Sequence, residues 1–403
     1  MNFNERKKDV LRILADLDIS PSMYSNATEK YNNIAKYLQE HGIVADMYPQ
    51  GSFALGTICR PYRKDKDPKY DLDFICQIVG DKDSYTPQKL KKEIEDVLDC
   101  SELYGGKVTI FPEGFTIEYA DIGGIGFSID IVPAIDESDE NKVDLKKICD
   151  SPELIDTAIA IPKFSESESG RWITNNPKGY RTWFEDINSP FATYSSEEHM
   201  KELFERNKTI YNTIEDVPAE LNRTSLQRVI QLLKYHRDVY FSRKQDGEAV
   251  RPNSSIITTL VTLIAKNLNP RLSIFDLLEA VLTELEIYAK YQKFGQAAFN
   301  EIYGLPKVEL KSVDDWKLLN PANPGDNLMD AWNSNSELPK NFFMWVKAAK
   351  SQLIDALYLD DYEFRSNIEN AFEPSNVSRI WGEKYSRSVS KPIDVQKAAK
   401  PWS

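Results

Sequence analysis

The sequence contains few of the residues that build metal or disulfide frameworks. Among its 403 residues are 4 cysteines and 3 histidines, and no two cysteines form a Cys-x-x-Cys pair. A structural zinc site and a Ser-His-Asp triad therefore have few candidates, and a disulfide framework is not expected. Cys76 lies within an apolar run, where a free thiol behaves as a small hydrophobic side chain. This use of cysteine predicts a cytoplasmic protein.

The chain also lacks a long hydrophobic run and an excess of positive charge. Its longest apolar stretch, Ile256 to Ala265, is too short to span a bilayer, and its charged N-terminus does not resemble a secretory signal. Lys and Arg number 50 against 63 Asp and Glu, which gives a net charge of −13. Proteins that grip DNA or RNA along their length usually carry a basic excess. We therefore expect neither membrane association nor constitutive nucleic-acid binding.

The residues that are present suit a large buried core, and the first half mixes helices with strands. Hydrophobic residues make up 41% of the sequence and aromatic residues 11%. Two helices are expected over residues 1–42, broken near Pro21, and a third over 87–98. Strand-like runs are found at 44–48, 70–79, 107–111, 115–121 and 125–132.

The second half is predicted to be helical. Residues 136–170 are acidic and rich in serine, and 165–170 are typical of a linker, while the residues after 373 are polar and expected to pack loosely. The helix-like segments are 197–213, 216–242, 254–268, 273–292, 338–358 and 361–371. We expect an α+β protein: a mixed sheet with helices in 1–190, a helical domain in 191–372, and a polar tail in 373–403. The functional site is expected in the cleft between the first two.

The most informative stretch is a strand with two aspartates. Side chains alternate along a strand, so Asp71 and Asp73 share one face while Leu72 and Phe74 face the core. Two neighbouring carboxylates repel each other and are costly to desolvate, so a structure that keeps them side by side generally needs a cation. Mg²⁺ suits such a pair because it binds one or two carboxylates and takes water and substrate phosphates as its other ligands.

A third carboxylate fits the same pattern. Asp130 is the single charge in the apolar run Phe127 to Val132, on the opposite face from its apolar neighbours. If this strand lies beside the first, three carboxylates converge, as in the two-metal sites of phosphoryl and nucleotidyl transfer. Four other aspartates of this half are expected to be solvated loop or turn residues. These are Asp65, Asp67, Asp121 and Asp136.

A Gly-Ser turn precedes the aspartates. Gly51 allows the backbone to approach a ligand closely, and Ser52 can cap a helix or donate its hydroxyl. Backbone N–H groups at such a turn form an anion site. An ordinary strand-to-helix turn is the more common meaning of Gly-Ser alone. Its position shortly before Asp71 and Asp73 favours the phosphate site.

These motifs together resemble a known family. The pattern Gln50-Gly51-Ser52-x-x-x-Gly56-Thr57, followed by Asp71-x-Asp73 and Asp130, resembles the DNA polymerase beta-like nucleotidyltransferase superfamily. Three further segments make the chain more similar to its CD-NTase (cGAS/DncV-like nucleotidyltransferase) family. These segments are 174–184, 232–238 and 251–257. The resemblance covers about residues 45–265, and the tail 380–385 matches the family pattern only loosely.

The resemblance implies a role for each of these residues. Asp71 and Asp73 would bind two Mg²⁺ ions, with Mn²⁺ as an alternative, and Asp130 would complete the site and help deprotonate the attacking ribose hydroxyl. The residues implied to bind the donor nucleotide are Gln50, Gly51, Ser52, Lys234, Ser254 and Ser255. The family further implies cyclic di- or trinucleotide synthesis from nucleoside triphosphates in bacterial antiphage signalling, an effector protein activated by the product, and regulatory or conjugating proteins that act on the C-terminal tail.

The helical half supports this interpretation through its own pattern. Lys234 belongs to a polar stripe on the 216–242 helix, which a cleft would turn toward a triphosphate. Ser254 and Ser255 precede an apolar helix, so one of them is expected at its N-cap. Aromatic residues at Tyr180, Trp183 and Phe184 are more typical of core than of a base-stacking platform. The basic residues Arg60, Arg63, Lys64, Lys66 and Lys69 most simply decorate a loop, although they could steer nucleotides.

Two other functions stay open at this point. A transferase that extends RNA ends would need a basic groove, which the net charge disfavours. A nucleotide-binding scaffold that kept the fold without activity is the other alternative, because a fold alone never proves chemistry. The zinc-binding insert of animal cyclic GMP-AMP synthase has no counterpart here, which argues against a DNA sensor.

Overall fold

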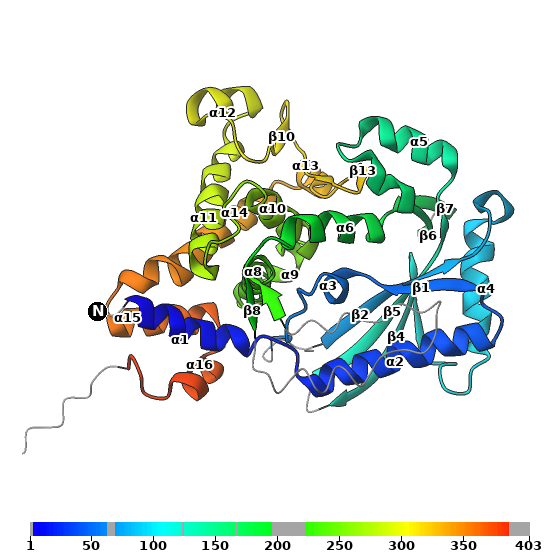
Figure 1. Cartoon of the computed structure of the whole chain (residues 1–403), viewed down its shortest axis with the longest axis horizontal. Helices are drawn as coiled ribbons and strands as arrows, with labels where there is room; N and C mark the ends of the chain where they lie inside the picture. Colours follow the sequence, from blue (N-terminus) through cyan, green and yellow to red (C-terminus); the bar gives the residue numbers. More distant parts are fainter. Residues whose placement is uncertain (1–2, 63–68, 123–124, 166–167, 196–221, 387–403) are drawn as a thin grey trace, which may run out of the picture.

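A computed structural model describes residues 3–62, 69–122, 125–165, 168–195 and 222–386. The first part of the chain builds a seven-stranded mixed sheet, and the remainder builds a helical half beside it (Figure 1). Strand β2 (Lys69–Ile78) lies between the edge strand β1 (Ala45–Pro49), to which it is antiparallel, and β5 (Ile125–Asp136), to which it is parallel. The order continues through β4 (Gly114–Ile122) to β3 (Val108–Phe111).

Helices cover the sheet because its strands alternate apolar and polar residues. Leu72 and Phe74 of β2 are fully buried, and the Phe74 ring meets Tyr31 of α2 (Pro21–Glu40) edge-on at 5.2 Å. Ser20 caps α2 by accepting from the backbone N–H of Met23. The other helices of this half are α3 (Gly51–Ala54), η1 (Lys82–Ser84), α4 (Pro87–Asp99), α5 (Asp139–Ile148), η2 (Pro152–Thr157) and α6 (Pro177–Asn188).

The linker predicted at 165–170 is wrong. Strands β6 (Ile159–Ser165) and β7 (Glu168–Asn175) form an antiparallel hairpin that extends the sheet from the end of β5. A polar hairpin turn and a linker have similar compositions, so the local sequence does not distinguish one from the other. The turn positions predicted for Asp121 and Asp136 are also wrong, since both lie within strands. Asp65 and Asp67 lie outside the described residues.

The helical half is built on α8 (Ser225–Ser242), which is buried along most of its surface. It packs against α9 (Gly247–Val250), α10 (Ser254–Ala265), α11 (Ile274–Tyr288), α14 (Glu337–Leu353) and α15 (Asp361–Ala371). Further helices of this half are η5 (Ala289–Gln292), α12 (Gln296–Tyr303), α13 (Asp330–Ser334) and η6 (Asp355–Tyr358). The helix predicted at 197–213 lies outside the described residues. The helix predicted at 216–242 is described only from Ser225, where α8 begins. Before it lies the strand β9 (Asn222–Thr224), which pairs with β8 (Thr193–Ser195).

Two small hairpins in the helical half were not predicted. They are β10 (Lys311–Ser312) with β11 (Asp315–Trp316), and β12 (Leu319–Asn320) with β13 (Asn323–Asn327). The second hairpin reaches back to the sheet half, because Asn323 Nδ2 donates to Thr174 O at 2.9 Å. The two halves are therefore joined on this side by direct hydrogen bonds.

The two ends of the described chain meet on the helical half. Helix α1 (Phe3–Ala15) lies against α16 (Pro374–Trp381), whereas α2 runs along the sheet (Figure 1). Trp381 is buried and its Nε1 donates to Asp9 O at 3.1 Å. The loose packing predicted for the tail is therefore wrong for α16, and residues beyond 386 are not described. No described helix is both long enough and apolar enough to cross a membrane.

Candidate active site

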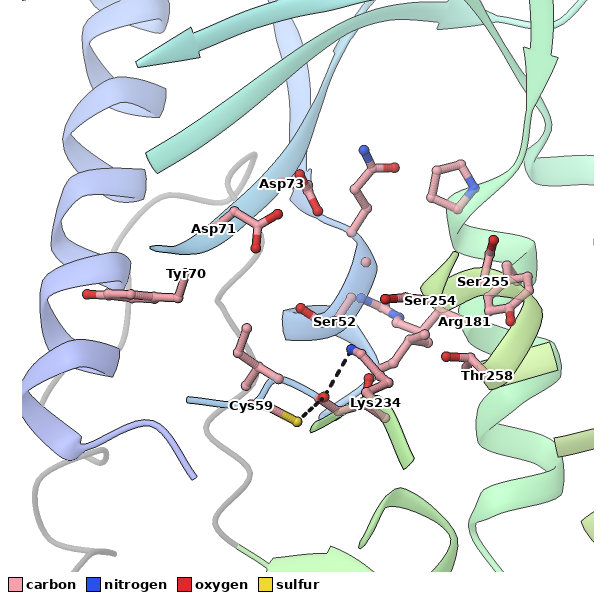
Figure 2. A pocket seen from close by; sticks show the side chains of 18 of the residues that line it. Ser52, Cys59, Tyr70, Asp71, Asp73, Arg181, Lys234, Ser254, Ser255 and Thr258 are labelled. Carbon is pink, nitrogen blue, oxygen red and sulfur yellow. Dashed lines mark hydrogen bonds between the residues drawn. The ribbon is translucent and has the colours of Figure 1, made fainter. Parts of the chain in front are cut away.

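A cavity of about 760 Å³ lies where the two halves face each other. It collects eight of the nine predicted site residues, from β2, the turn into α3, α8 and α10 (Figure 2). They are Gln50, Gly51, Ser52, Asp71, Asp73, Lys234, Ser254 and Ser255. The ninth, Asp130, lies one strand away from Asp73.

The carboxylates share one face of the sheet. Parallel pairing of β2 with β5 sets Asp73 directly beside Asp130, while Asp71 lies two residues along β2. Thr116 of β4 donates its hydroxyl to Asp130 Oδ1 at 2.7 Å, which fixes this side chain. In Figure 2 the side chains of Asp71 and Asp73 both project from β2 above Ser52. The geometry agrees with the strand-face argument made from alternation alone.

The electrostatics of this face favour a bound cation. Burial is the largest cause that raises the pKa of Asp73 well above its usual value, and the negative charges of Asp71 and Asp130 raise it further. Lys234 opposes this shift. The pKa of Asp130 is also raised, chiefly by burial, with the Thr116 hydrogen bond acting against it. Such a cluster of carboxylates lowers its free energy by binding a positive ion.

The residues fit a hard divalent cation whose other ligands come from substrate and water. Nowhere in the described ranges are three His, Cys, Asp or Glu side chains already arranged around one ion position. Mg²⁺ needs no such cage, because it is held by one or two carboxylates together with phosphate oxygens. Asp71 and Asp73 line the cavity and supply that pair.

The turn into α3 is shaped around Asp73. Gln50 donates its backbone N–H to Asp73 O at 2.8 Å, and Gly51 then adopts φ +64°. A Cβ at Gly51 would approach Asp73 Oδ2 to 2.7 Å, so only glycine fits here. Gln50 takes the N-cap position of α3, and Ser52 is its second residue, so Ser52 does not cap this helix. Its side chain lines the cavity instead.

Lys234 enters the cavity from α8. Its exposed fraction is 8%, and its Nζ donates to Thr57 O at 3.3 Å (Figure 2). Burial lowers its pKa, an effect that Cys59 opposes. The polar stripe predicted on α8 is therefore present. Its residues contact the loop after α3.

The two serines of α10 also reach the cavity, although not as caps. Asn253 is the N-cap residue, so the serine cap predicted here is wrong. Ser254 Oγ accepts from Arg237 Nη1 at 2.9 Å, and Arg237 also donates to Pro252 O. This arrangement places a guanidinium and a hydroxyl side by side at the edge of the cavity.

Sequence reasoning missed several residues that line the cavity. Arg181 and Tyr180 follow the Asn-Pro turn, and the Tyr180 hydroxyl pairs with Thr259 Oγ1 at 2.8 Å. Trp183 and Phe184 are core residues, as expected. Others include Arg237, Asp238, Arg251, Asn320 and Asp326. No local signal identified Asn320 and Asp326, because they come from the unpredicted β12–β13 hairpin. Of the basic cluster, Arg60 and Lys69 line the cavity, and the rest lies outside the described ranges.

Comparisons with known proteins agree with the fold and the sequence pattern. No protein-family model matches the chain. The c-di-GMP synthase of Roseivirga ehrenbergii is 25% identical over 352 residues, which cover 86% of this chain and 78% of the relative. The CD-NTase CdnG of Bradyrhizobium diazoefficiens, solved in complex with GTP, has a TM-score of 0.62 at 19% identity, with 92% of this chain and 97% of that one covered.

A second solved enzyme has the same architecture. CdnC of E. coli MS115-1, solved with ATP, has a TM-score of 0.53 at 14% identity and covers 92% of this chain and 98% of its own. In its complex with HORMA-deltaN the TM-score is 0.51 at 14% identity, with coverages of 92% and 97%. The fold expected from the motifs is thereby confirmed: the chain has the fold of the solved CD-NTase CdnG, and its sequence is similar to that of a c-di-GMP synthase.

Proposed function

We propose that this chain is a template-independent nucleotidyltransferase that joins nucleoside triphosphates into a cyclic di- or trinucleotide. One observation carries the proposal: a single cavity brings Asp71 and Asp73 together with the Gly51-Ser52 turn and with Lys234 from the other half. Carboxylates, a backbone turn open to phosphate and a buried ammonium are the groups that in-line transfer at an α-phosphorus requires.

Each side chain has a role in this account. Asp71 and Asp73 would hold two Mg²⁺ ions, which when bound neutralise charge on the phosphate oxygens. Ser52 and Lys234 grip the donor triphosphate from opposite sides, and Ser254 and Ser255 contact it from α10. We assign Asp130 Oδ2 as the acceptor of the proton from the attacking ribose hydroxyl. Thr116 orients the carboxylate through the other oxygen.

We take GTP as the first substrate to test, since the curated relative is a c-di-GMP synthase and the CdnG structure holds GTP. By the same reasoning the product would activate an effector protein in antiphage defence, in the cytoplasm where nucleoside triphosphates are made. The HORMA complex of CdnC supports a regulatory protein as a further partner. Proteins acting on the C-terminal tail remain part of this proposal.

Labelled nucleoside triphosphates and Mg²⁺ provide the test. After incubation with the protein, phosphatase removes labelled terminal phosphates, and the surviving label is identified by mass spectrometry. We expect a phosphatase-resistant cyclic product that is lost in the Asp71→Ala/Asp73→Ala variant. Extended RNA ends in place of a ring would support the polymerase-like alternative. Nucleotide binding without any product would support the inactive scaffold.

A further inference from the structure

The loop after α3, residues 55–58, is held by an unbroken series of hydrogen bonds. Four consecutive backbone carbonyls each accept from a side chain of β9 or α8, and these side chains lie on one side of the loop. The pairs are Gln227 Nε2 to Leu55 O (3.0 Å), Arg223 Nη1 to Gly56 O, Lys234 Nζ to Thr57 O (3.3 Å) and Gln231 Nε2 to Ile58 O (2.7 Å). We call this set the carbonyl clamp.

The clamp lies directly behind the cavity. Its loop continues from Gly51 and Ser52, and Leu55, Thr57 and Ile58 themselves line the cavity wall. A loop with free carbonyls would exchange its hydrogen bonds with water and sample several conformations. Fixing these four carbonyls on β9 and α8 sets where Ser52 lies relative to Lys234, across the junction of the two halves.

One buried carboxylate organises the donors of this clamp. Asp18 lies in the connection between α1 and α2, is 7% exposed, and is not among the residues that line the cavity. Its Oδ1 accepts from Arg223 Nε at 2.9 Å, Gln231 Nε2 at 3.1 Å and Arg228 Nη1 at 2.8 Å. Two of these three donors are also members of the clamp. The neighbouring Leu17 O accepts from the backbone N–H of Arg60 at 2.7 Å, so the same connection also holds the chain that follows the loop.

We infer that Asp18 is a positioning residue for nucleotide transfer, which acts through Arg223 and Gln231 on the loop that carries the triphosphate turn. This inference rests on the proposed function. A buried carboxylate between two guanidiniums is weak evidence for a gain in stability, because both charges must be desolvated. Its geometric effect is clear: it fixes the direction of the two side chains that hold Gly56 and Ile58.

The variant Asp18→Asn keeps the shape of the side chain and removes its charge. Glu137→Gln is the matched control, because Glu137 is also a buried carboxylate with a cationic partner, Lys82, but is neither a lining residue of the cavity nor a partner of the carbonyl clamp. We expect the KM for GTP to rise at least about tenfold in Asp18→Asn with kcat changed by less than about threefold, as the loss of a charge-assisted contact implies. Glu137→Gln is expected to lower the melting temperature without changing KM.

A second readout does not depend on activity. Cys59 follows the clamp, its Sγ donates to Gln231 O at 3.4 Å, and burial raises its pKa to about 11, so it should react slowly with iodoacetamide. Cys76, buried in the sheet, reports global opening. In Asp18→Asn we expect the labelling rate of Cys59 relative to Cys76, measured by mass spectrometry, to rise at least about tenfold. If Asp18→Asn does not fold, the KM for GTP and the labelling rate of Cys59 are measured in Gln231→Met instead.

The outcomes separate the two proposals. Unchanged KM and unchanged Cys59 labelling in Asp18→Asn, or equal effects in Glu137→Gln, would overturn the role of Asp18. A wild-type protein that forms no product contradicts the proposed function, and Cys59 labelling then decides on the positioning role alone.

Discussion

Gly51 occupies a position where a single methyl group would change the site. Its φ of +64° and the 2.7 Å approach of a Cβ to Asp73 Oδ2 both exclude larger residues. Gly42 is the matched control, since its φ is +93° and nothing lies within 4 Å of its Cβ position. We expect both alanine variants to lose about 1–2 kcal/mol of unfolding free energy from backbone strain. Only Gly51→Ala should also lose product formation, measured as initial rate; equal rates in the two variants would contradict this contact.

Asp73 and Asp130 should make the metal-free protein sensitive to pH. Because both pKa values are raised, the native state binds protons more tightly than the unfolded chain. Stability should therefore fall as pH rises from about 4, the ordinary aspartate pKa, through the raised values. In EDTA, Asp73→Asn is expected to raise the melting temperature at neutral pH and to flatten this dependence, as followed by calorimetry. The exposed Asp136→Asn serves as control, and identical pH profiles for wild type and Asp73→Asn would refute the argument.

Helix α8 links the two halves at the site, because Lys234 donates to the loop after α3 and its charge acts on Asp73. Lys234→Met keeps the apolar stem and removes the charge. Loss of one charge-assisted contact to phosphate should raise the KM for GTP about ten- to a hundredfold. Lys234→Arg should recover only part, since a planar guanidinium cannot replace a point charge inside a buried site. Steady-state kinetics decide, and a wild-type KM in Lys234→Met would remove Lys234 from the site.

The buried amide of Asn176 makes one of the contacts between the β12–β13 hairpin and the sheet half. Asn176 Nδ2 donates to Leu154 O and to Ala322 O, both at 2.8 Å, and Oδ1 accepts from Gly179 N at 3.0 Å. Asn176→Ala leaves two carbonyls and one N–H without these partners, so we expect a loss of about 2–4 kcal/mol in denaturant unfolding. Asn267→Ala, on an exposed helix end, is the control. A loss below about 1 kcal/mol would contradict the role of this amide.

Features that depend on strand alternation could be predicted from the sequence. Features that depend on contacts between segments far apart in the chain could not. Asp71, Asp73 and Asp130 could be placed on one face because β2 and β5 are buried strands with a clear period of two. The position of Asn320 in the cavity wall could not be predicted, because no local sequence pattern connects its short hairpin to a cavity that is built largely by other elements. The same limit explains the missed tail helix α16, whose burial depends on α1 at the other end of the chain.

In the proposed function, both halves of the protein bind one nucleotide in one cavity. Isothermal titration with an α,β-methylene analogue of GTP and Mg²⁺ tests it without turnover. We predict that Asp71→Asn/Asp73→Asn, in the sheet half, and Lys234→Met, in the helical half, each weaken binding by about tenfold or more. Lys92→Met, an exposed residue of α4, should bind like wild type. Wild-type affinity in either of the first two variants would contradict the claim.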